Sequence, residues 1–392
     1  MSKHKISDFL ENYGDGIHGS PNYDENGTVY FINGNNLVNG KIQINANTLK
    51  ITEEEANKIK RDLNEKTLLL SINGTLGNIA LYNHEKITLG KSACFLNVKE
   101  EKDKIFLKYV LSTKEFKKYM QLVATGSTIK NLAPSQVANY EFELKDNVDK
   151  YKVSNLLSSI DNKIENNNKI NAELESLAKT IYDYWFLQFE FPNEEGKPYK
   201  SSGGKMVWNK ELKREIPEGW AVKKLNSIAN LYQPEILPSN LMKEDGKYFV
   251  YGANGIVGRY NKFNHEHPEI AICCRGASCG NYLMTLPKSW ITGNSMVVTP
   301  KDSSVTKEYL YHSLRYIDIK RYVTGSAQPQ ITRSNLDGIK VVIPPFKSLE
   351  HFSNKAEKIR NELIKNINEN NELSSLRDFL LPMLMNGQVQ FK

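Results

Sequence analysis

Two long stretches of the chain carry apolar residues at alternating four- and three-residue intervals, which is the spacing of a coiled-coil seam. The first stretch has Ile, Ile, Asn, Asn, Leu, Ala, Ile and Trp at positions 160, 164, 167, 171, 174, 178, 181 and 185. The second has Ile, Leu, Asn, Asn, Leu, Arg, Leu and Leu at positions 359, 363, 366, 370, 373, 377, 380 and 384. The pattern predicts two long helices, and the first, from Lys150 to Phe186, would measure roughly 54 Å at about 1.5 Å per residue.

Each predicted seam contains two asparagines, Asn167 and Asn171 in the first helix and Asn366 and Asn370 in the second. A buried asparagine lowers the stability of an apolar seam but fixes its register, because a slipped pairing leaves the amide without a hydrogen-bond partner. If the two helices pair antiparallel, the four asparagines converge near the middle of the seam, and we expect them to set its register. The alternative is that they face solvent, and the heptad spacing holds either way.

Ahead of each predicted helix, short β-rich runs alternate with glycine-containing turns. The runs are Val29–Ile32, Leu68–Ile72 and Ala80–Tyr82 in the first half, and Phe249–Tyr251, Ile270–Cys274 and Met296–Thr299 in the second. Asn39-Gly40, between two short β-prone pairs, is a hairpin signal. A short helical pattern also occurs in each half, near Phe106–Leu122 and Tyr309–Val323. Together these patterns predict two mixed α+β modules.

The two halves of the chain repeat each other. A shift of 199 residues aligns Thr125-Gly126-Ser127 with Thr324-Gly325-Ser326, and it gives fourteen identical positions over about fifty residues without a gap. Upstream, Leu70–Asn78 resembles Cys273–Asn281. The stretch Phe191–Gly219, rich in Pro, Gly, Ser and charge, is expected to be a connector. The sequence therefore predicts a module followed by a helix, built twice about a pseudo-twofold axis.

Composition narrows the class of protein only modestly. The net charge of +7, from 52 basic and 45 acidic residues, fits a polyanionic partner, although many proteins without one are equally basic. The four cysteines, Cys94, Cys273, Cys274 and Cys279, do not form a disulfide framework, which favours a reducing cytoplasm. No run approaches 18 apolar residues and the first residues lack an apolar signal segment, so we expect neither a membrane span nor secretion.

Three motifs that resemble catalytic or metal sites fail on their chemistry. Ile343-Pro344-Pro345-Phe346 resembles the pocket of an amino-methyltransferase, but isoleucine cannot accept a hydrogen bond from a target amine. Leu89-Gly90-Lys91-Ser92 resembles the end of a phosphate-binding loop, but Glu85 stands where that loop needs glycine. In the group His265, His267, Cys273, Cys274 and Cys279, the adjacent cysteines cannot easily chelate one tetrahedral ion. We therefore expect no catalytic residue, metal or bound cofactor in this chain.

The order of module, long helix, linker, module and long helix resembles the specificity subunit of type I restriction-modification systems. Phe191–Tyr199 and Ser201–Met206 are similar to that family's linker after the central helix, and Ile216–Trp220 is similar to the entry into its second recognition domain. Asp15–Pro21 resembles a common opening of the first domain, and Ile343–Pro345 resembles the usual exit into the helix. The resemblance covers essentially the whole chain.

Together with the repeat, this resemblance implies five segments. They are a first target-recognition domain (1–147), a central spacer helix (148–190), a linker (191–217), a second target-recognition domain (218–346) and a C-terminal spacer helix (347–392). The expected fold is α+β, with two mixed α/β target-recognition domains separated by two long antiparallel coiled-coil helices.

The resemblance implies a non-catalytic subunit that recognises an asymmetric bipartite sequence in double-stranded DNA. Its implied partners are two methyltransferase subunits, which use S-adenosylmethionine to methylate adenine, and nuclease/translocase subunits that use ATP and Mg. The alternative is a helical scaffold or adaptor protein without sequence-specific DNA reading. A methyltransferase gene beside the gene for this chain would argue against that alternative.

Loop residues with amide, hydroxyl, imidazole or cationic side chains are the candidates for DNA contacts, because Asn and Gln can bind adenine, and Arg guanine, through two hydrogen bonds. In the first module the candidates are His18, Ser20, Asn33, Asn35, Asn36, Ser127, Thr128 and Lys130. In the second they are Tyr251, Asn254, Arg259, Arg275, Gln328, Gln330 and Arg333. For any single one, the alternative is an ordinary turn residue.

Overall fold

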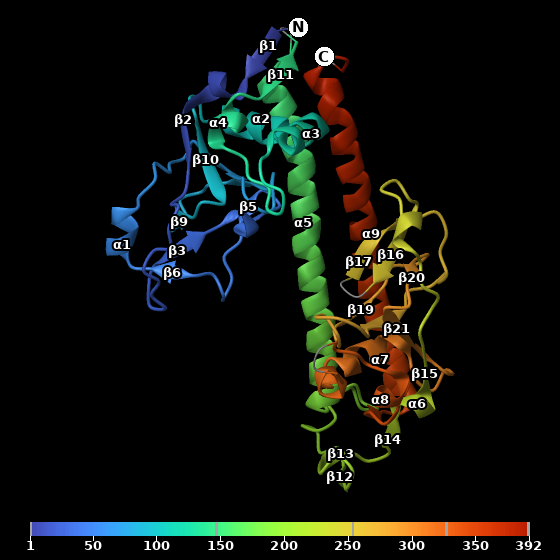
Figure 1. Ribbon diagram of the computed structural model, residues 1–392. Helices are drawn as coiled ribbons and strands as arrows, with labels where there is room; N and C mark the ends of the chain where they lie inside the picture. Colours follow the sequence, from blue (N-terminus) through green and yellow to red (C-terminus); the bar gives the residue numbers. More distant parts are fainter. Residues whose placement is uncertain (1, 146–147, 253–254, 326–327, 390–392) are drawn as a thin grey trace. The chain divides into compact units, whose positions relative to one another are not determined.

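The computed structural model describes residues 2–145, 148–252, 255–325 and 328–389 (Figure 1). The chain forms two compact units. Unit 1 comprises Met1–Asn166 and Glu369–Lys392, and unit 2 comprises Asn167–Asn368. Each unit therefore contains one module together with a part of each long helix.

Unit 1 is built on an antiparallel four-stranded sheet. Its strands, in the order in which they pair, are β2 (Leu10–Asp15), β10 (Ala93–Val98), β7 (Thr67–Ser71) and β8 (Ile79–Leu81). A three-stranded sheet pairs β6 (Lys50–Ile51), β3 (Val29–Ile32) and β9 (Ile87–Leu89), and two further pairs are β1 (Ser2–Lys5) with β11 (Glu141–Leu144) and β4 (Leu37–Val38) with β5 (Lys41–Ile42). The helical segments are η1 (Ile6–Phe9), η2 (Gly34–Asn36), α1 (Glu53–Lys58), α2 (Asp103–Val110), α3 (Lys114–Val123) and α4 (Pro134–Ala138).

The four-stranded sheet of unit 1 is buried on both faces, because its central strands are continuously apolar rather than alternating. Leu68 and Leu70 of β7 lie in a core that includes Phe106 of α2. Leu69, between them, lies in a second core with Ile32 of β3. Since successive strand residues point to opposite faces, helices cover one face of the sheet and the three-stranded sheet covers the other.

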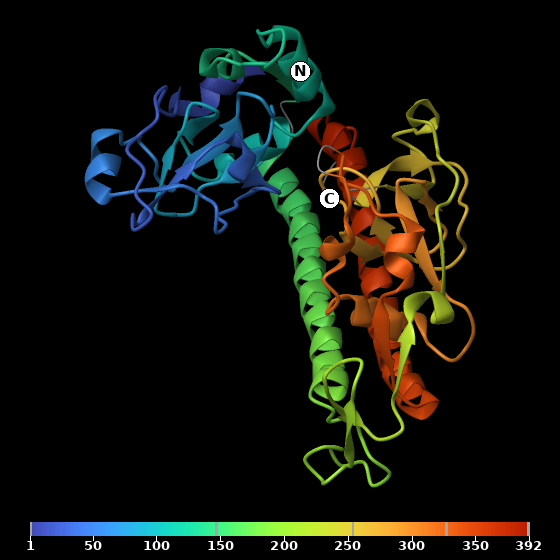
Figure 2. The ribbon, with the colours of Figure 1, turned by 60° about the horizontal axis from the view of Figure 1, so that its bottom comes forward.

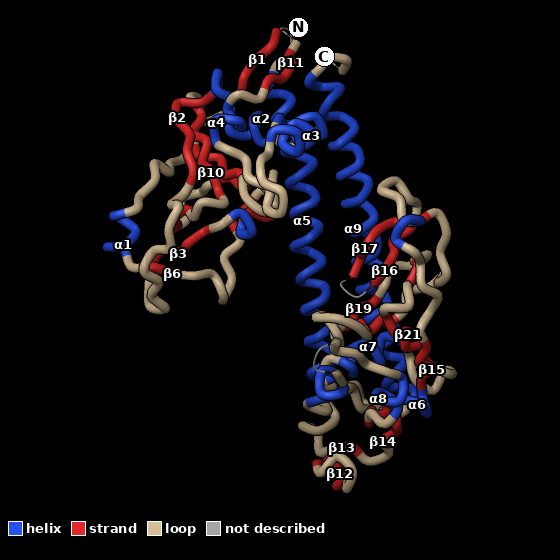
Figure 3. The backbone as a smooth tube through the Cα atoms, in the orientation of Figure 1, coloured by secondary structure: helices blue, strands red, loops and turns tan. Residues whose placement is uncertain are grey.

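Unit 2 repeats this construction (Figure 3). Its four-stranded sheet has the order β15 (Ala229–Tyr232), β21 (Ser295–Pro300), β18 (Ile270–Cys273) and β19 (Tyr282–Met284). The smaller sheets are β17 (Gly255–Tyr260), β16 (Tyr248–Gly252) and β20 (Trp290–Ile291), then β14 (Ala221–Lys224) with β22 (Lys340–Ile343), and β12 (Met206–Asn209) with β13 (Arg214–Pro217). The helical segments are α6 (Leu225–Ile228), η4 (Ser239–Leu241), α7 (Lys307–Leu314), η5 (Ile319–Tyr322) and α8 (Arg333–Asp337).

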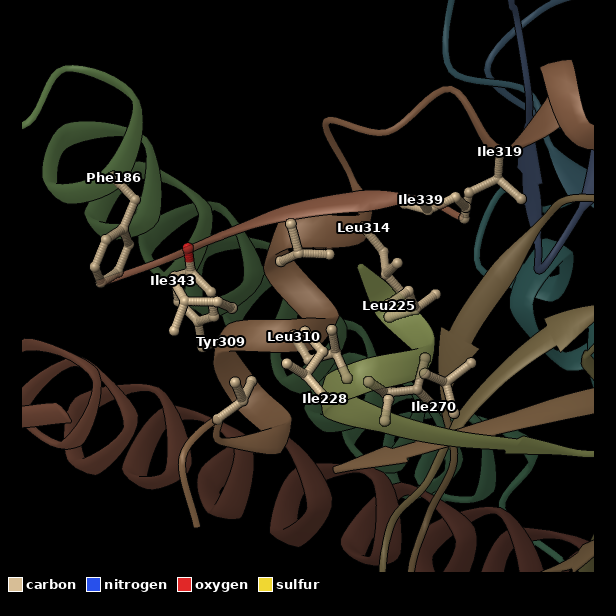
Figure 4. Close-up of a cluster of buried hydrophobic side chains, with 14 of the residues drawn as sticks. Phe186, Leu225, Ile228, Ile270, Tyr309, Leu310, Leu314, Ile319, Ile339 and Ile343 are labelled. Atoms are coloured by element: carbon tan, nitrogen blue, oxygen red, sulfur yellow. The ribbon is translucent and has the colours of Figure 1, made fainter. Parts of the chain in front are cut away.

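The cores of unit 2 have the same two layers. Figure 4 shows Ile270 of β18 beside α6 and α7, in the core that also holds Tyr309 and Leu310. Ala271 lies in the opposite core with Ile291 of β20. The matching strand orders and layers confirm the predicted duplication of one mixed α/β module.

The local predictions hold with two refinements. Asn39 and Gly40 connect β4 to β5 with φ angles of 50° and 81°, the left-handed values that a type I′ hairpin turn requires. The helical pattern near Phe106–Leu122 is two helices, α2 and α3, and the pattern near Tyr309–Val323 is α7 followed by the 3₁₀ turn η5. The first module thus has a second α-helix, α3, where the second module has only the 3₁₀ turn η5.

Both long helices are present. They are α5 (Lys150–Tyr182), which continues as the π-helical turn η3 (Asp183–Leu187), and α9 (Phe346–Met385). Figure 2 shows α5 running without a break. In unit 1, Arg377 Nη1 donates to Asp161 Oδ1 at 2.9 Å, and Lys163 Nζ lies 3.3 Å from Glu369 Oε2. Residue numbers rise along α5 as they fall along α9, so the pairing is antiparallel, as predicted.

In unit 2 the same antiparallel pairing continues through the asparagines. Asn366 Nδ2 donates to Asn171 Oδ1 at 2.9 Å, and Trp185 contacts His351 with ring centroids 5.2 Å apart. Asn167 is only 1% exposed, so the alternative of a solvent-facing asparagine does not hold there. Asn370 is half-buried.

The connector contributes to the core of unit 2 more than its composition predicted. Its β12–β13 hairpin ends at Ile216 and Pro217, and Ile216 is buried. Phe191 is also buried, and Tyr199 stacks on it with ring centroids 4.6 Å apart. A Pro- and Gly-rich composition correctly indicated turns, but it did not reveal these apolar anchors.

Candidate nucleic-acid interface

In unit 1, a hairpin loop from Thr125 to Asn131 lies against the turn that follows β7. Thr125 and Asn131 exchange backbone hydrogen bonds of 2.9 and 2.8 Å, and the Gly74 N–H donates to the Lys130 carbonyl at 3.0 Å. Gly126 has a φ of +96°, and a Cβ there would lie 2.2 Å from the Ile129 carbonyl oxygen. Only glycine fits this position without a steric clash.

Unit 2 contains the same pair of loops. Thr324 and Gln330 exchange two backbone hydrogen bonds of 2.8 Å, and the Gly276 N–H donates to the Pro329 carbonyl at 3.1 Å. Gly325 has a φ of +83°, and a Cβ there would lie 2.6 Å from the Gln328 carbonyl oxygen. We call the two segments in each unit, the turn after the sheet strand and the hairpin, the paired loops.

The structure corrects the alignment of these turns by one residue. The Ser71 N–H donates to the Asn78 carbonyl at 2.8 Å, and the Cys273 N–H donates to the Asn281 carbonyl at 2.7 Å. Ser71 is therefore equivalent to Cys273, which makes Asn73 the counterpart of Arg275. The turn in unit 2 carries one extra residue, which the gap-free comparison of Leu70–Asn78 with Cys273–Asn281 did not place.

The paired loops of unit 1 present polar side chains to solvent. The predicted residues Ser127, Thr128 and Lys130 are all exposed on the hairpin. Asn73 Nδ2 donates to Asn131 Oδ1 at 3.1 Å, which joins the turn to the hairpin. Sequence reasoning missed Asn73 and Asn131, although a corrected repeat alignment identifies them as the counterparts of Arg275 and Gln330.

The paired loops of unit 2 border a hollow of about 300 Å³. Three predicted residues line it, namely Arg275, Gln330 and Arg333. Gln233 also lines it, and its side-chain amide donates to Cys274 Sγ and to the Gly293 carbonyl, each at 3.3 Å. Gln233 was missed because nothing in its local sequence distinguishes it. Gln328 is exposed on the hairpin nearby.

Other predicted residues of unit 1 lie outside the paired loops. His18 is exposed and its Nε2 lies 2.7 Å from Asp15, and Ser20 and Asn35 are also exposed. Asn33 and Asn36 instead hold the turn η2. Asn33 Oδ1 accepts from Ser92 at 2.8 Å, while Asn36 Oδ1 accepts the Asn33 N–H at 2.9 Å. The structure therefore corrects the interpretation of Asn33 and Asn36, whose amides stabilise this turn.

In unit 2, Tyr251 is a core residue and the prediction of a DNA contact for it is wrong. It is 5% exposed, its hydroxyl accepts the Leu286 N–H at 3.2 Å, and burial raises the pKa of this phenol. Arg259 is half-buried on β17, with its guanidinium 4.2 Å from the centroid of the Phe249 ring. Asn254 lies outside the described residues.

The clustered cysteines of unit 2 pack in the protein interior. Cys273, Cys274 and Cys279 are buried free thiols, and burial raises the pKa of each. Within the described part of the chain, no three His, Cys, Asp or Glu side chains come together as a metal site would require. Over the same residues, the structure has no helix with the length and apolar character needed to span a bilayer.

Comparison with known proteins gives one consistent result. A family model described as the type I restriction modification DNA specificity domain matches residues 2–176 and 217–373. The MjaIX type I restriction enzyme specificity subunit of Methanocaldococcus jannaschii is 27% identical over 392 residues, covering 93% of this chain and 87% of that protein. The HindI specificity subunit of Haemophilus influenzae is 21% identical over 357 residues, covering 72% and 77% of the two chains.

A crystal structure of the S subunit of a type I restriction-modification system from M. genitalium has the same fold. It superposes with a TM-score of 0.57 at 20% sequence identity, over 100% of this chain and 96% of that one. The family model matches each of the two modules with its helix and together more than half of the chain. The protein belongs to the family of type I restriction-modification DNA specificity subunits, whose members confer sequence specificity and do no catalysis.

Proposed function

We propose that this chain reads an asymmetric bipartite sequence in double-stranded DNA, with one module for each half-site. The observation that carries the proposal is the repeated pair of loops, which is joined by equivalent backbone hydrogen bonds in both modules but carries different side chains. Equivalent backbone positions hold the base-contacting side chains of the two modules, and different side chains there select different bases. The DNA site that the two modules bind then determines where the partner subunits methylate adenine and where they restrict the DNA.

The proposed division of labour follows the five segments. Residues 1–147 and 218–346 are the target-recognition domains, 148–190 and 347–392 are the spacer helices, and 191–217 is the linker. The proposed DNA contacts are the predicted residues whose side chains are exposed or line the hollow of unit 2. They are His18, Ser20, Asn35, Ser127, Thr128, Lys130, Arg275, Gln328, Gln330 and Arg333. Arg259, which is half-buried, is also proposed as a contact.

We assign the spacer helices a second task, the docking of two methyltransferase subunits. Leu177 of α5 and Leu376 of α9 are equivalent under the 199-residue repeat, and both are unusually exposed, at 48% and 45%. Two equivalent apolar positions fit two copies of one partner. S-adenosylmethionine would be bound by those subunits, and ATP and Mg by the nuclease/translocase subunits, in the cytoplasm where the genome is accessible.

The register of the helix pair is assigned to Asn167, Asn171, Asn366 and Asn370. The hydrogen bond between Asn171 and Asn366 supports this assignment, since a shift of one residue would break it and leave both amides without this partner. Fixed register matters for a two-site reader, because it determines which faces of the two helices carry the modules.

The decisive experiment maps methylated adenines in host cells with and without this gene. The expected result is methylation at a bipartite motif with two different half-sites, which disappears when the gene is deleted. An unchanged methylation pattern after deletion would contradict the proposal. It would favour the alternative, in which the helices serve as a scaffold that assembles proteins without reading DNA.

A further inference from the structure

The paired loops carry different hydrogen-bonding groups at positions that are equivalent in the two modules. Asn73 occupies the turn position that Arg275 occupies in unit 2, and Asn131 occupies the hairpin position of Gln330. In both units these two residues form a β-bridge with each other. The backbone therefore places both pairs at equivalent bridge positions, where the two modules differ in the side chains that they present.

In unit 1, the two amides form a composite recognition surface. Asn73 Nδ2 donates to Asn131 Oδ1 at 3.1 Å, so the two residues engage one amide donor of Asn73 and the amide acceptor of Asn131 with each other. Oδ1 of Asn73 remains as an acceptor and Nδ2 of Asn131 remains as a donor. Adenine presents the complementary pattern in the major groove, with N7 as acceptor and the N6 amino group as donor.

In unit 2, the equivalent turn position carries only donors. The Arg275 guanidinium has five N–H groups in a fixed fork and no acceptor. Guanine presents two adjacent acceptors, N7 and O6, which this fork matches, whereas adenine would place its own amino group against a donor. Arg275 is exposed at the rim of the hollow, together with Gln330 and Arg333.

We infer that these pairs determine base specificity, so that Asn73 and Asn131 read an A·T pair in one half-site and Arg275, beside Gln330, reads a G·C pair in the other. The inference rests on the proposed DNA-reading function and extends it to one base position in each half-site. Repeat-related positions carrying different donors and acceptors are then the reason why the bipartite target is asymmetric.

The test transplants one pair into the other module. The full-length chain carrying Arg275→Asn and Gln330→Asn is incubated with a randomised DNA library at fixed salt, and the bound DNA is sequenced. One position of the second half-site should change from G·C to A·T, with a loss of guanine preference of about tenfold or more. The first half-site should not change. The reciprocal chain, Asn73→Arg and Asn131→Gln, should convert A·T to G·C in the first half-site only.

Arg321→Gln is the matched control. It removes the same charge from unit 2, but Arg321 pairs with Asp318 at 2.9 Å and is not among the residues that line the hollow. It should weaken binding to all sequences alike and change no base preference. Because all the substituted side chains are exposed or half-buried, the variants should keep the wild-type melting curve.

The outcomes separate this inference from the proposed function. If the wild-type chain enriches no sequence, the proposed function itself fails. If the wild type enriches a bipartite motif and the transplanted chain keeps every preference, or changes the wrong half-site, the inference fails alone. A folded transplant that enriches nothing would also overturn it, because only one base position should be affected.

Discussion

Asp161 is one of the residues through which α5 contacts the first module. Its carboxylate accepts hydrogen bonds from Lys108 at 2.5 Å and Tyr109 at 2.8 Å on α2, and from Arg377 on α9 at 2.9 Å. Burial would raise the pKa of Asp161, but the contacts with Lys108, Arg377 and Tyr109 together outweigh burial and lower it. We therefore predict that Asp161→Asn, which keeps the shape and removes the charge, destabilises unit 1.

The magnitude lies between two known limits. Removing one partner of a buried ion pair costs about 3–5 kcal/mol, because the other charge is left buried, whereas an exposed pair contributes about 0–1 kcal/mol. The side chains of Asp161 and Lys108 are 21% and 19% exposed, so water screens them partly. We expect a loss of about 2–3 kcal/mol in the free energy of unfolding. For a unit of this size, the melting temperature should fall by about 4–12 °C.

The assay must report on unit 1 separately. All four tryptophans lie between residues 185 and 290, within unit 2, so their fluorescence during urea unfolding reports on that unit and provides an internal control. Unit 1 is followed by hydrogen exchange of the amides of β7 and β10. Asp161→Asn should lower their protection, and a double-mutant cycle with Arg377→Gln should show a coupling of about 1 kcal/mol or more.

The matched control is Glu54→Gln in unit 1, which breaks an exposed pair with Lys58. Glu54 is fully exposed, so its loss should leave the protection of β7 and β10 unchanged. If Asp161→Asn behaves like this control, or if the cycle shows no coupling with Arg377, the Asp161 contacts do not anchor the module and the reasoning is wrong.

Three further predictions address the hairpin, a buried histidine and the docking surface. Gly126→Ala should abolish selection of the first half-site and preserve the second in library sequencing, whereas Gly196→Ala, in open space, should preserve both. Burial, with Arg360 and Arg315, lowers the pKa of His312 to about 3. As pH falls, the His312 imidazole is therefore protonated in the unfolded chain before it is protonated in the folded one. Unit 2 should lose stability as pH falls from about 6.5 towards 3. His312→Gln should reduce this dependence of the unfolding free energy on pH, measured by tryptophan-monitored urea unfolding. Leu376→Asp should reduce the number of bound methyltransferase subunits from two to one by native mass spectrometry, whereas Leu241→Asp, also in an exposed position, should leave it at two.

The features that could be predicted from sequence are those encoded by periodicity. The heptad spacing located both long helices, since an apolar seam requires that spacing whatever its partner. The 199-residue repeat then implied two modules of one fold, and Asn39-Gly40 placed a turn because its backbone needs left-handed φ angles. In each case a local geometric requirement restricts which residue types are allowed.

The features that could not be predicted depend on tertiary neighbours. Tyr251 and Arg275 are both polar residues near strand ends, but one is buried beside Leu286 and the other lines a hollow. No local pattern separates them, because burial is decided by elements far away in sequence. Asn33 was selected as an amide in a loop, yet its acceptor is occupied by Ser92, which is 59 residues away. Donor and acceptor occupancy, rather than residue type, decides which amides are left to bind DNA.

The duplication has diverged in its anchors as well as in its loops. The repeat places Arg360 at the position of Asp161, with the opposite charge. Arg360 Nη2 donates to Glu308 on α7 at 3.0 Å, and its guanidinium lies 5.0 Å from the centroid of the Tyr311 ring. At this position α5 supplies the anion and the module supplies the cation in unit 1, whereas in unit 2 these roles are reversed. Each module therefore matches its own helix at this position and would meet like charge there on the other helix.

The charges between α5 and α9 have also diverged between the two repeats. In unit 1, α9 contributes Arg377 against Asp161 and Glu369 against Lys163, while the repeat-related positions on α5 are Ala178 and Ile170. If a second α9 took the place of α5, Arg377 would face Arg360 and Glu369 would face Glu362, like charge against like at both positions. Such contacts are destabilising, whereas the pairing of α5 with α9 satisfies both charges in unit 1. The two helices descend from one sequence, but each is now complementary to the other and no longer to itself.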